Sequence, residues 1–366
     1  MATGGTGVGG SPDGSRQGAG DVAGAPDGID VEGVTRWLEE RTELLGPLDV
    51  EVIQGGRSNL TYRVTDPAGR QVILRRPPLH GVIESAHDMG REHRIIAALA
   101  ATEVPVPPVV GFEPEADVTG APFYVMRFVD GAVLRDQETA EQAVDDAARR
   151  TAGLDLVDVL VRLHAVDPDE VGLGDLGRKQ DYLARQLRRW HGQLEKARTR
   201  ELPLLDEVHA RLVADIPDQG PAAIVHGDYR LDNLIVDPAD GKVRAVLDWE
   251  LTTLGDPLAD LGLLQCYWSQ PGDPTQPLPG APTLAAGFPA RQDLVERYAA
   301  GSGRDVSQLP YYVAFGYWKL ACILEGVYAR FASGAYGETD DSFEHFGRVV
   351  VELGERAAEA ATEAGR

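Results

Sequence analysis

The segment of residues 226–262 constrains the fold more than any other part of the chain. It contains two short runs of strand-forming residues, 234–236 and 245–247, with the dipeptide Asp240-Gly241 between them. An Asp-Gly dipeptide flanked by apolar runs is a strong signal for a tight β-hairpin turn. Pro238 weakens the pairing next to this turn and can lengthen the loop without moving the open end far. The sequence therefore predicts that the two runs pair as an antiparallel hairpin.

The open end of this hairpin gathers side chains that can bind a metal ion. With the Asp-Gly dipeptide as the turn, Asn233 faces Asp248, and Asp228 lies a short loop upstream. Carboxylate and amide oxygens suit a hard cation such as Mg²⁺, and a further carboxylate can orient or deprotonate a hydroxyl. Turn and cap chemistry explains such a cluster equally well from its spacing. We expect Asp260 to brace the loop and His226 to orient it rather than to bind metal.

The composition narrows the function classes. The chain has 366 residues, with 35 Lys+Arg against 58 Asp+Glu, and a formal net charge of −23. Such an acidic chain is not expected to bind nucleic acid or anionic membranes, whose surfaces attract Lys and Arg. With only two cysteines, Cys266 and Cys322, no disulfide framework is expected, and no apolar run approaches the ~18 residues of a membrane span. We therefore expect a cytoplasmic protein of about two domains or lobes.

The chain divides by pattern into a tail and two lobes. Residues 1–29 are rich in Gly, Ala and Pro and contain no aromatic residue, so we predict a disordered tail. Residues 30–130 predict an N-lobe with a helix from Asp30 to Gly46, strands at 50–53, 60–64, 71–75 and 123–126, and a helix at 85–100. From Gly131 the pattern becomes mostly helical, so residues 131–366 predict a C-lobe. The fold class that follows is α+β.

Two motifs in the C-lobe resemble the catalytic and metal motifs of the aminoglycoside phosphotransferase family. The run His226-Gly227-Asp228 leads to Asn233, and Asp248-Trp249-Glu250 follows. The segment is especially similar to the branch found as the N-terminal kinase-like domain of some acyl-CoA dehydrogenases, and the similarity covers about residues 31–360. The resemblance implies a protein-kinase-like two-lobed fold. Its small antiparallel β-rich N-lobe would cover the nucleotide, and its larger, mostly helical C-lobe would hold the catalytic loop, metal site and acceptor site.

The resemblance also implies roles for individual residues, with ATP and Mg²⁺ as cofactors and a small-molecule hydroxyl acceptor as partner. Asp228 would face the acceptor hydroxyl, and Arg230 would stand where protein kinases have a phosphate-contacting lysine. Asn233 and Asp248 would bind Mg²⁺. The nucleotide contacts would come from the loop residues Gly56, Arg57, Ser58 and Asn59, from Arg75 and its helix partner Glu92, and from the hinge residues Met126, Phe128 and Val129.

One position departs from the family pattern. The third strand offers Arg75, or alternatively Arg76, where the general family and protein kinases have lysine. Arginine is always charged and forks to phosphate oxygens, but it is longer than lysine and is not interchangeable with it. The resemblance implies that the residue at this position contacts the α- and β-phosphates, so the arginine puts that contact in question.

Acceptor recognition is less constrained by the sequence. Residues 181–200 read as a helix with six basic and two acidic side chains. This stretch is either a solvated helix face above core residues such as Leu187 and Trp190, or a surface that attracts an anionic acceptor such as a coenzyme A thioester. Glu325, within a predicted core helix at 311–328, either lines the acceptor cleft or forms a buried salt bridge.

Several functions are compatible with these patterns. The leading one is an ATP- and Mg²⁺-dependent kinase that phosphorylates a small molecule, such as a hydroxyacyl-CoA-like or other anionic acceptor. An aminoglycoside-type kinase and a kinase-like module that binds nucleotide with little catalysis are the alternatives, and Arg75 is the best support for the module. A protein kinase is disfavoured because no A-P-E segment follows Asp248. A metal-dependent hydrolase would need no nucleotide. The sequence leaves the oligomeric state open.

Overall fold

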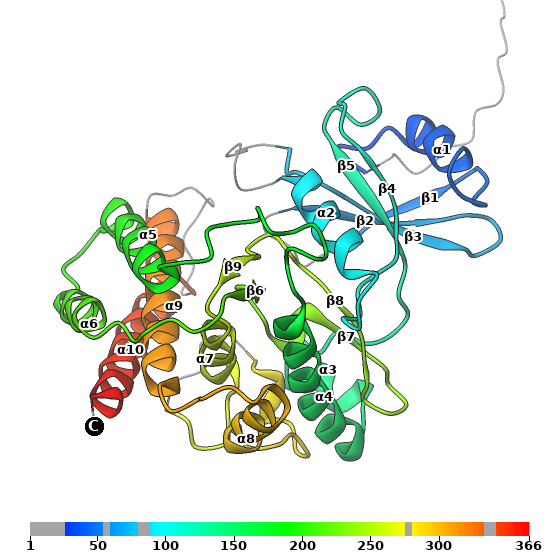
Figure 1. Cartoon of the computed structure of the whole chain (residues 1–366). Coiled ribbons are helices and arrows are strands. Elements are labelled where there is room, and N and C mark those ends of the chain that lie inside the picture. Colours follow the sequence, from blue (N-terminus) through cyan, green and yellow to red (C-terminus); the bar gives the residue numbers. More distant parts are fainter. Residues whose placement is uncertain (1–25, 54–58, 80–87, 275–279, 333–341, 366) are drawn as a thin grey trace, which may run out of the picture.

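The computed structural model describes residues 26–53, 59–79, 88–274, 280–332 and 342–365, which form a sheet-bearing part and a helical part (Figure 1). The sheet has five antiparallel strands in the order β1-β2-β3-β5-β4. The remainder of the described chain is mostly helical and contains two small two-stranded sheets. The predicted α+β class is therefore confirmed.

The sheet-bearing part contains the predicted strands and one more. Its elements are α1 (Val31–Glu39), β1 (Asp49–Val52), β2 (Leu60–Thr65), β3 (Gln71–Arg76), α2 (Met89–Leu99), β4 (Val109–Glu113) and β5 (Phe123–Arg127).

The prediction that the first helix extends to Gly46 is wrong, because α1 ends at Glu39. The Thr42 hydroxyl donates to the Leu38 carbonyl (2.7 Å) and accepts from the Leu44 amide (3.1 Å). This side chain competes with the backbone hydrogen bonds that would continue the helix.

Strand β3 is buried on both faces, so its alternation decides which arginine reaches the helical part. Val72 and Leu74 pack in a core cluster with α1, whereas Ile73 packs in the large core that includes α2 and the helical part. Successive side chains of a strand point to opposite faces. Arg75 therefore shares the face of Ile73, and Arg76 shares the face of α1.

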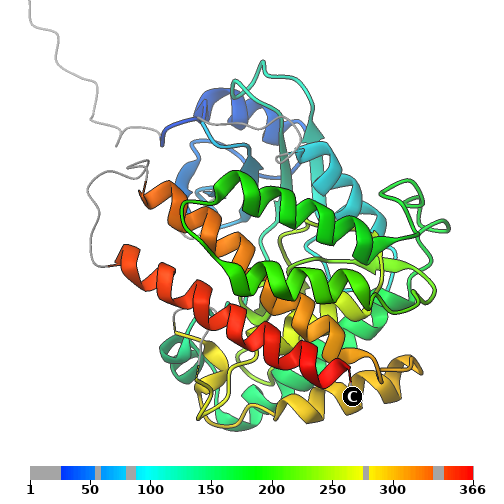
Figure 2. The ribbon, with the colours of Figure 1, turned by 90° about the vertical axis from the view of Figure 1, so that its left-hand side faces the viewer.

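The helical part is built around α9 and its neighbours. Its elements are α3 (Gln137–Ala143), α4 (Asp146–Ala165), α5 (Tyr182–Ala197), α6 (Pro203–Ala214), β6 (Ala223–Val225), η1 (Leu231–Asn233), β7 (Leu234–Val236), β8 (Val243–Val246), β9 (Thr253–Gly255), α7 (Leu258–Tyr267), η2 (Pro282–Leu284), α8 (Arg291–Ser302), α9 (Leu309–Ala332) and α10 (Ser342–Ala364). Helix α9 contacts α5, α6, α7 and α10, and Figure 2 shows α5, α6 and α10 as neighbouring helices on one side of the molecule. Side chains of α7 and α9 contact the loop that follows β6.

The hairpin predicted at 234–247 is present, but its register differs from the prediction by one residue at the open end. Strands β7 and β8 pair Leu234 with Val246, and a register shift follows toward the turn. The loop is longer than the expected two-residue turn, because the Asp237 amide donates to the Lys242 carbonyl (2.8 Å) and encloses residues 238–241. Asn233 consequently faces Leu247 rather than Asp248. The open end still brings Asn233 and the start of the next loop together.

Some sequence predictions fall on residues outside those that the structure describes. They concern the loop residues Gly56, Arg57 and Ser58, residues 1–25 of the expected tail, and residues 85–87 at the start of the helix expected at 85–100. Ile29, at the end of that tail, is described and is buried beside α1. Across the described ranges, no helix has the length and apolar character needed to cross a bilayer.

Candidate active site

The loop after β6 is held by side chains from both the hairpin and helix α7. Asp260 of α7 accepts hydrogen bonds from the backbone amides of His226 (2.7 Å) and Gly227 (2.8 Å). The His226 ring donates from Nε2 to the Leu247 carbonyl (2.9 Å) and accepts at Nδ1 from the Asp228 amide (3.3 Å). These contacts match the bracing and orienting roles expected for Asp260 and His226. They fix the backbone on which Asp228 stands.

Asp228 is partly buried among donors that hold its carboxylate in one orientation. The Tyr267 hydroxyl donates to Oδ1 (2.9 Å), while Asn233 Nδ2 (3.0 Å) and Arg230 Nε (3.1 Å) donate to Oδ2. Burial by itself would raise the pKa of Asp228, but the nearby charges of Arg230 and Lys319 outweigh burial and lower this pKa. The carboxylate is therefore ionised near neutral pH and able to accept a hydrogen bond from a hydroxyl.

Arg230 links Asp228 to a second carboxylate. Its Nη1 lies 2.8 Å from Asp232 Oδ2, and its guanidinium lies 5.2 Å from the centre of the Tyr267 ring. Burial raises the pKa of Asp232 to about 6, although Arg230 opposes that change. The predicted pair Asp228 and Arg230 is thus brought together, with Arg230 already engaged by acidic partners.

The two predicted metal ligands stand at the open end of the β7–β8 hairpin. Asn233 directs Nδ2 to the main-chain carbonyl (2.8 Å) and carboxylate of Asp228, so its Oδ1 is the atom that can bind a cation. The Leu247 amide donates to the Asn233 carbonyl (2.8 Å) and places Asp248 directly beyond this pair. Asp248 has a φ of +63°. Residues other than glycine rarely adopt a positive φ, and Asn and Asp adopt it more often than most. An amide oxygen and a carboxylate are a donor set that fits Mg²⁺.

Arg75 connects the sheet to this metal-binding pair. Its Nη1 lies 3.3 Å from Glu92 Oε2 and its Nη2 lies 3.4 Å from Asp248 Oδ1. Arg76, the alternative candidate, points to the other face and donates to the Thr119 carbonyl (2.8 Å). Burial would lower the pKa of Arg75, but the neighbouring acidic groups outweigh burial and raise it, so the guanidinium stays charged. Within the described residues Arg75 Nε has no hydrogen-bond partner.

Of the described residues predicted to contact the nucleotide, some contact Glu92, the partner of Arg75, and others lie in or after β5. Asn59 Nδ2 donates to Glu92 Oε1 (2.9 Å), and the Tyr124 hydroxyl donates to Glu92 Oε2 (2.9 Å). Met126 is buried within β5, whereas Phe128 and Val129 follow the strand where the chain passes to the helical part. The Phe128 amide contacts the Gln71 carbonyl at 3.5 Å. The expected hinge thus lies at the junction between the two parts.

A cavity of about 220 Å³ adjoins these groups. It is bounded by α2, α5 and residues 250–253, and Arg91, Gln186 and Arg189 line it. The basic helix predicted at 181–200 is present as α5, which ends at Ala197, and Arg189 of this helix reaches the cavity. The core interpretation of this helix holds for Leu187 and Trp190, which are buried.

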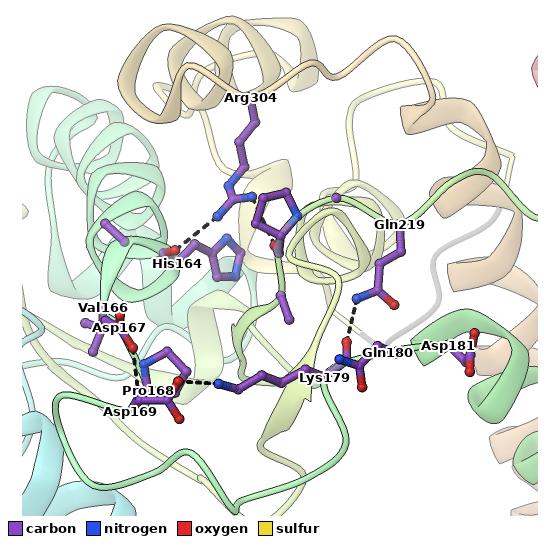
Figure 3. Close-up of a pocket in the computed structure, with 14 residues that line it drawn as sticks. His164, Val166, Asp167, Pro168, Asp169, Lys179, Gln180, Asp181, Gln219 and Arg304 are labelled. Carbon is purple, nitrogen blue, oxygen red and sulfur yellow. Dashed lines mark hydrogen bonds and ion pairs between the residues drawn. The ribbon is translucent and has the colours of Figure 1, made fainter.

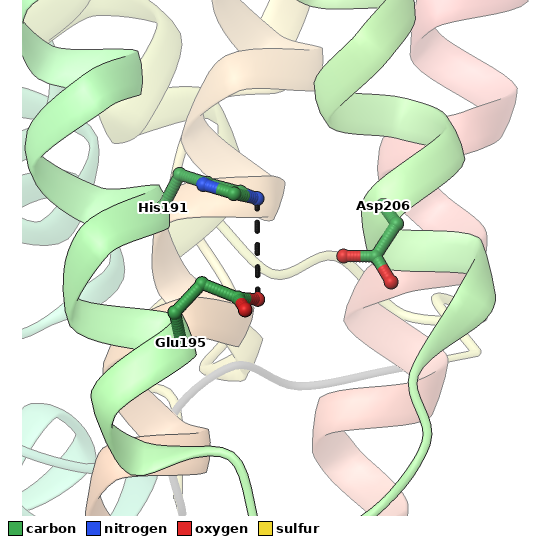
Figure 4. Close-up of side chains that lie close together, drawn as sticks. All are labelled: His191, Glu195 and Asp206. Carbon is green, nitrogen blue, oxygen red and sulfur yellow. Dashed lines mark ion pairs between the residues drawn. The ribbon is translucent and has the colours of Figure 1, made fainter.

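A second hollow and a cluster of polar side chains lie apart from this site. A hollow of about 760 Å³, near His164, Lys179 and Arg304, is lined by none of the predicted site residues (Figure 3). His191, Glu195 and Asp206 lie close together (Figure 4). Arg198 binds Glu195 and Asp206 at 2.6 Å each, so this cluster is an ion-pair network.

The two readings offered for Glu325 are distinguished by its contacts. Its carboxylate is fully buried and accepts from Arg200 Nη2 at 2.9 Å. Arg200 also donates from Nη2 to the Gly347 carbonyl (3.0 Å). Glu325 therefore forms the buried salt bridge, and it is not among the residues that line the 220 Å³ cavity.

Comparison with known proteins adds family information to this geometry. The sequence profile of the phosphotransferase enzyme family matches residues 49–298. Acyl-CoA dehydrogenase family member 10 of Mus musculus is 32% identical over 327 residues, which cover 88% of this chain and 30% of the mouse protein. The chain thus spans about a third of the length of that relative. The similarity expected to the kinase-like branch of acyl-CoA dehydrogenases is confirmed.

Solved structures share the fold. A crystal structure from Ralstonia eutropha, provisionally named an aminoglycoside phosphotransferase, is 32% identical with a TM-score of 0.78 and covers 92% of this chain and 99% of its own. A thermostable aminoglycoside phosphotransferase mutant in complex with AMP-PNP and hygromycin B has a TM-score of 0.58 at 16% identity, over 91% of this chain and 99% of its own. The second likeness concerns the fold alone. Together they confirm the predicted kinase-like architecture.

Proposed function

Because the chain belongs to the phosphotransferase enzyme family, we propose that it transfers the γ-phosphate of ATP, in a Mg²⁺-dependent reaction, to a hydroxyl group of a small molecule. The observation that carries this proposal is the convergence of Asp228, Asn233 and Asp248 with the buried Arg75–Glu92 pair. A binding scaffold without chemistry would not require an ionised, fully oriented carboxylate beside the metal-binding pair.

The proposed chemistry relies on positioning and charge. Phosphoryl transfer passes through a loose transition state, so an enzyme mainly aligns the reactants and stabilises charge. Asn233 and Asp248 would hold Mg²⁺, which neutralises phosphate oxygens when bound. Asp228 would accept a hydrogen bond from the acceptor hydroxyl, align its oxygen and take its proton late in the transfer. Arg75 would contact the phosphates from the sheet, and Arg230 would stabilise negative charge from the catalytic loop.

The chain after Asp248 favours a small acceptor over a peptide. Strand β9 begins at Thr253 and pairs with β6, and α7 begins at Leu258. The segment between Asp248 and β9 is therefore only a short loop, which leaves little length for the activation segment with which protein kinases bind peptides.

The acceptor that we propose is anionic, such as a hydroxyacyl-CoA-like molecule, because the basic helix α5 borders the cavity. Arg189 on α5 and Arg91 on α2 line it, together with the carboxylates of Asp88, Glu92 and Glu250. The name of the mouse relative, an acyl-CoA dehydrogenase family member, points to the same class of molecule. An aminoglycoside would meet the two guanidinium groups as well as these carboxylates, so it is the alternative acceptor to be tested.

The experiment is an acceptor screen that follows ADP release from Mg·ATP, with hydroxyacyl-CoAs and aminoglycosides side by side. Once an acceptor is found, Asp228→Asn is expected to lower kcat by about 10²–10⁴-fold. Asp240→Asn is the matched control, because Asp240 is an exposed carboxylate in the loop of the same region. Equal turnover by Asp228→Asn and wild type would remove Asp228 from the mechanism.

A further inference from the structure

A lysine is buried in the middle of the apolar helix α9, beside the catalytic loop. Lys319 is 7% exposed, and its Nζ donates to the Gly227 carbonyl at 2.8 Å. Within the described residues, no carboxylate lies within ion-pair distance of this amine. Burial lowers the pKa of Lys319, while Asp228 and Asp260 oppose that change. Burying an ammonium with a carbonyl as its direct partner is strongly unfavourable, so the position calls for a specific reason.

The contact fixes the peptide group that directly precedes Asp228. The carbonyl of that peptide accepts from Lys319, and its amide, on Asp228, donates to His226 Nδ1 (3.3 Å). The preceding amide, on Gly227, donates to Asp260 (2.8 Å). Two successive peptide groups are therefore held by neighbouring helices, one by a carboxylate on α7 and the other by an ammonium on α9.

The backbone at Gly227 is closely packed against residue Leu251. Gly227 has a φ of +85°, and a Cβ at this position would lie 2.9 Å from the Leu251 carbonyl oxygen. A residue with a side chain would therefore be strained here both in conformation and in space. The Asp228 side chain extends from this peptide group, so a shift of the peptide would move the carboxylate relative to its donors Tyr267 and Asn233.

We infer that Lys319 is a positioning residue for phosphoryl transfer: its ammonium holds the Gly227 carbonyl and thereby aligns Asp228 with the acceptor hydroxyl. This inference rests on the proposed function. A neutral donor would satisfy the same carbonyl, but the positive charge also attracts the carboxylates of Asp228 and Asp260, which flank the loop. The Lys319 ammonium also lies 5.5 Å from the centre of the Trp190 ring, so the same residue connects the loop to α5.

The test uses three variants of the full chain. Lys319→Met keeps the apolar stem and removes both donor and charge, and Lys319→Arg restores both. Tyr311→Phe is the matched control, because the Tyr311 hydroxyl also joins α9 to a backbone carbonyl, that of Leu212 (2.7 Å), away from the loop. For each protein we would measure kcat, the KM for ATP, the thermal midpoint and amide hydrogen exchange of a peptide that covers residues 224–231.

Lys319→Met is expected to lower kcat by on the order of 10²-fold, the size of effect that a misplaced catalytic group produces, with the KM for ATP unchanged. Exchange in residues 224–231 should rise in this variant alone, and Lys319→Arg should recover most of the lost kcat. Tyr311→Phe should lose thermal stability and keep its kcat. A Lys319→Met enzyme with wild-type kcat and wild-type exchange would overturn the inference.

Failure of the proposed function has a different signature. A wild type that releases no ADP with any acceptor would contradict the kinase proposal, and the exchange comparison would still decide whether Lys319 fixes the loop. If Lys319→Met does not fold, Lys319→Gln supplies a neutral donor in its place. Wild-type kcat and exchange in Lys319→Gln would overturn the role of the charge, and reduced kcat with a normal thermal midpoint would support it.

Discussion

Removal of the Arg75 cation should destabilise the protein through the partner that it leaves behind. Glu92 is 2% exposed, and its Oε2 lies 3.3 Å from Arg75 Nη1. Asn59 and Tyr124 also donate to this carboxylate, but neither carries a positive charge. In Arg75→Met, Glu92 would therefore be a buried carboxylate without a countercharge.

The size of the expected loss in the free energy of unfolding follows from the burial of both Arg75 and Glu92. Breaking a buried ion pair by removing one partner typically costs about 3–5 kcal/mol, whereas replacing both partners is often nearly neutral. We expect Arg75→Met to lower the free energy of unfolding by about 3 kcal/mol at pH 7, and the double variant Arg75→Met/Glu92→Gln to lower it by about 1 kcal/mol or less. The side-chain amide introduced by Glu92→Gln would retain an acceptor for the Asn59 amide.

Urea unfolding of wild type, both single variants and the double variant closes a double-mutant cycle. Burial raises the pKa of Glu92 even with Arg75 present, and without Arg75 this pKa rises further in the folded state. Since a raised folded-state pKa favours folding as pH falls, the deficit of Arg75→Met should shrink from pH 8 toward pH 5. A double variant as unstable as Arg75→Met, or a deficit that does not change with pH, would refute this reasoning.

Two further outcomes test the loop and the cavity. Asp260→Asn should lower the free energy of unfolding by roughly 2–4 kcal/mol at pH 7, because the carboxylate accepts two backbone amides and the His164 ring. Burial would raise the pKa of Asp260, but its hydrogen bonds and the nearby histidines outweigh burial and lower this pKa. The stability that the ionised Asp260 contributes is therefore lost as pH falls, and the stability difference between Asp260→Asn and wild type in urea unfolding should shrink below about pH 4. Arg189→Glu should raise the KM for an anionic acceptor roughly tenfold and leave the KM for ATP unchanged, whereas the exposed Arg188→Glu should change neither. Equal acceptor KM values in steady-state assays of the two arginine variants would contradict the assignment of the cavity.

Much of the site was predictable because its residues are close in sequence. Asp228, Asn233 and Asp248 belong to one loop and one hairpin, so hairpin geometry alone brings them together. The register differed by one residue because Pro238 cannot donate to the ladder and the loop takes up four residues. The choice between Arg75 and Arg76 needed the face of β3, which is apolar on both sides and so gives no sequence pattern.

Other parts depend on contacts between distant segments. Strand β4 was missed because it begins at Val109, directly after the prolines that favoured a loop. Tyr267 and Lys319 were missed because their helices read as apolar core, and nothing local indicates which side chain faces Asp228. A lone lysine within such a helix is the one signal that could have drawn attention to α9. Its partner, Gly227, lies 92 residues away in sequence.

The central claim, a Mg²⁺-dependent nucleotide site at the end of the hairpin, is tested most directly by calorimetric titration of ATP with and without Mg²⁺. The variant for comparison is Asp248→Asn, since Asn tolerates the φ of +63° at this position and removes only the charge. We expect one-site Mg·ATP binding to the wild type and at least about tenfold weaker binding both without Mg²⁺ and in Asp248→Asn, a loss of about 1.4 kcal/mol. Equal ATP affinity under all three conditions, or no binding to the wild type, would contradict the account.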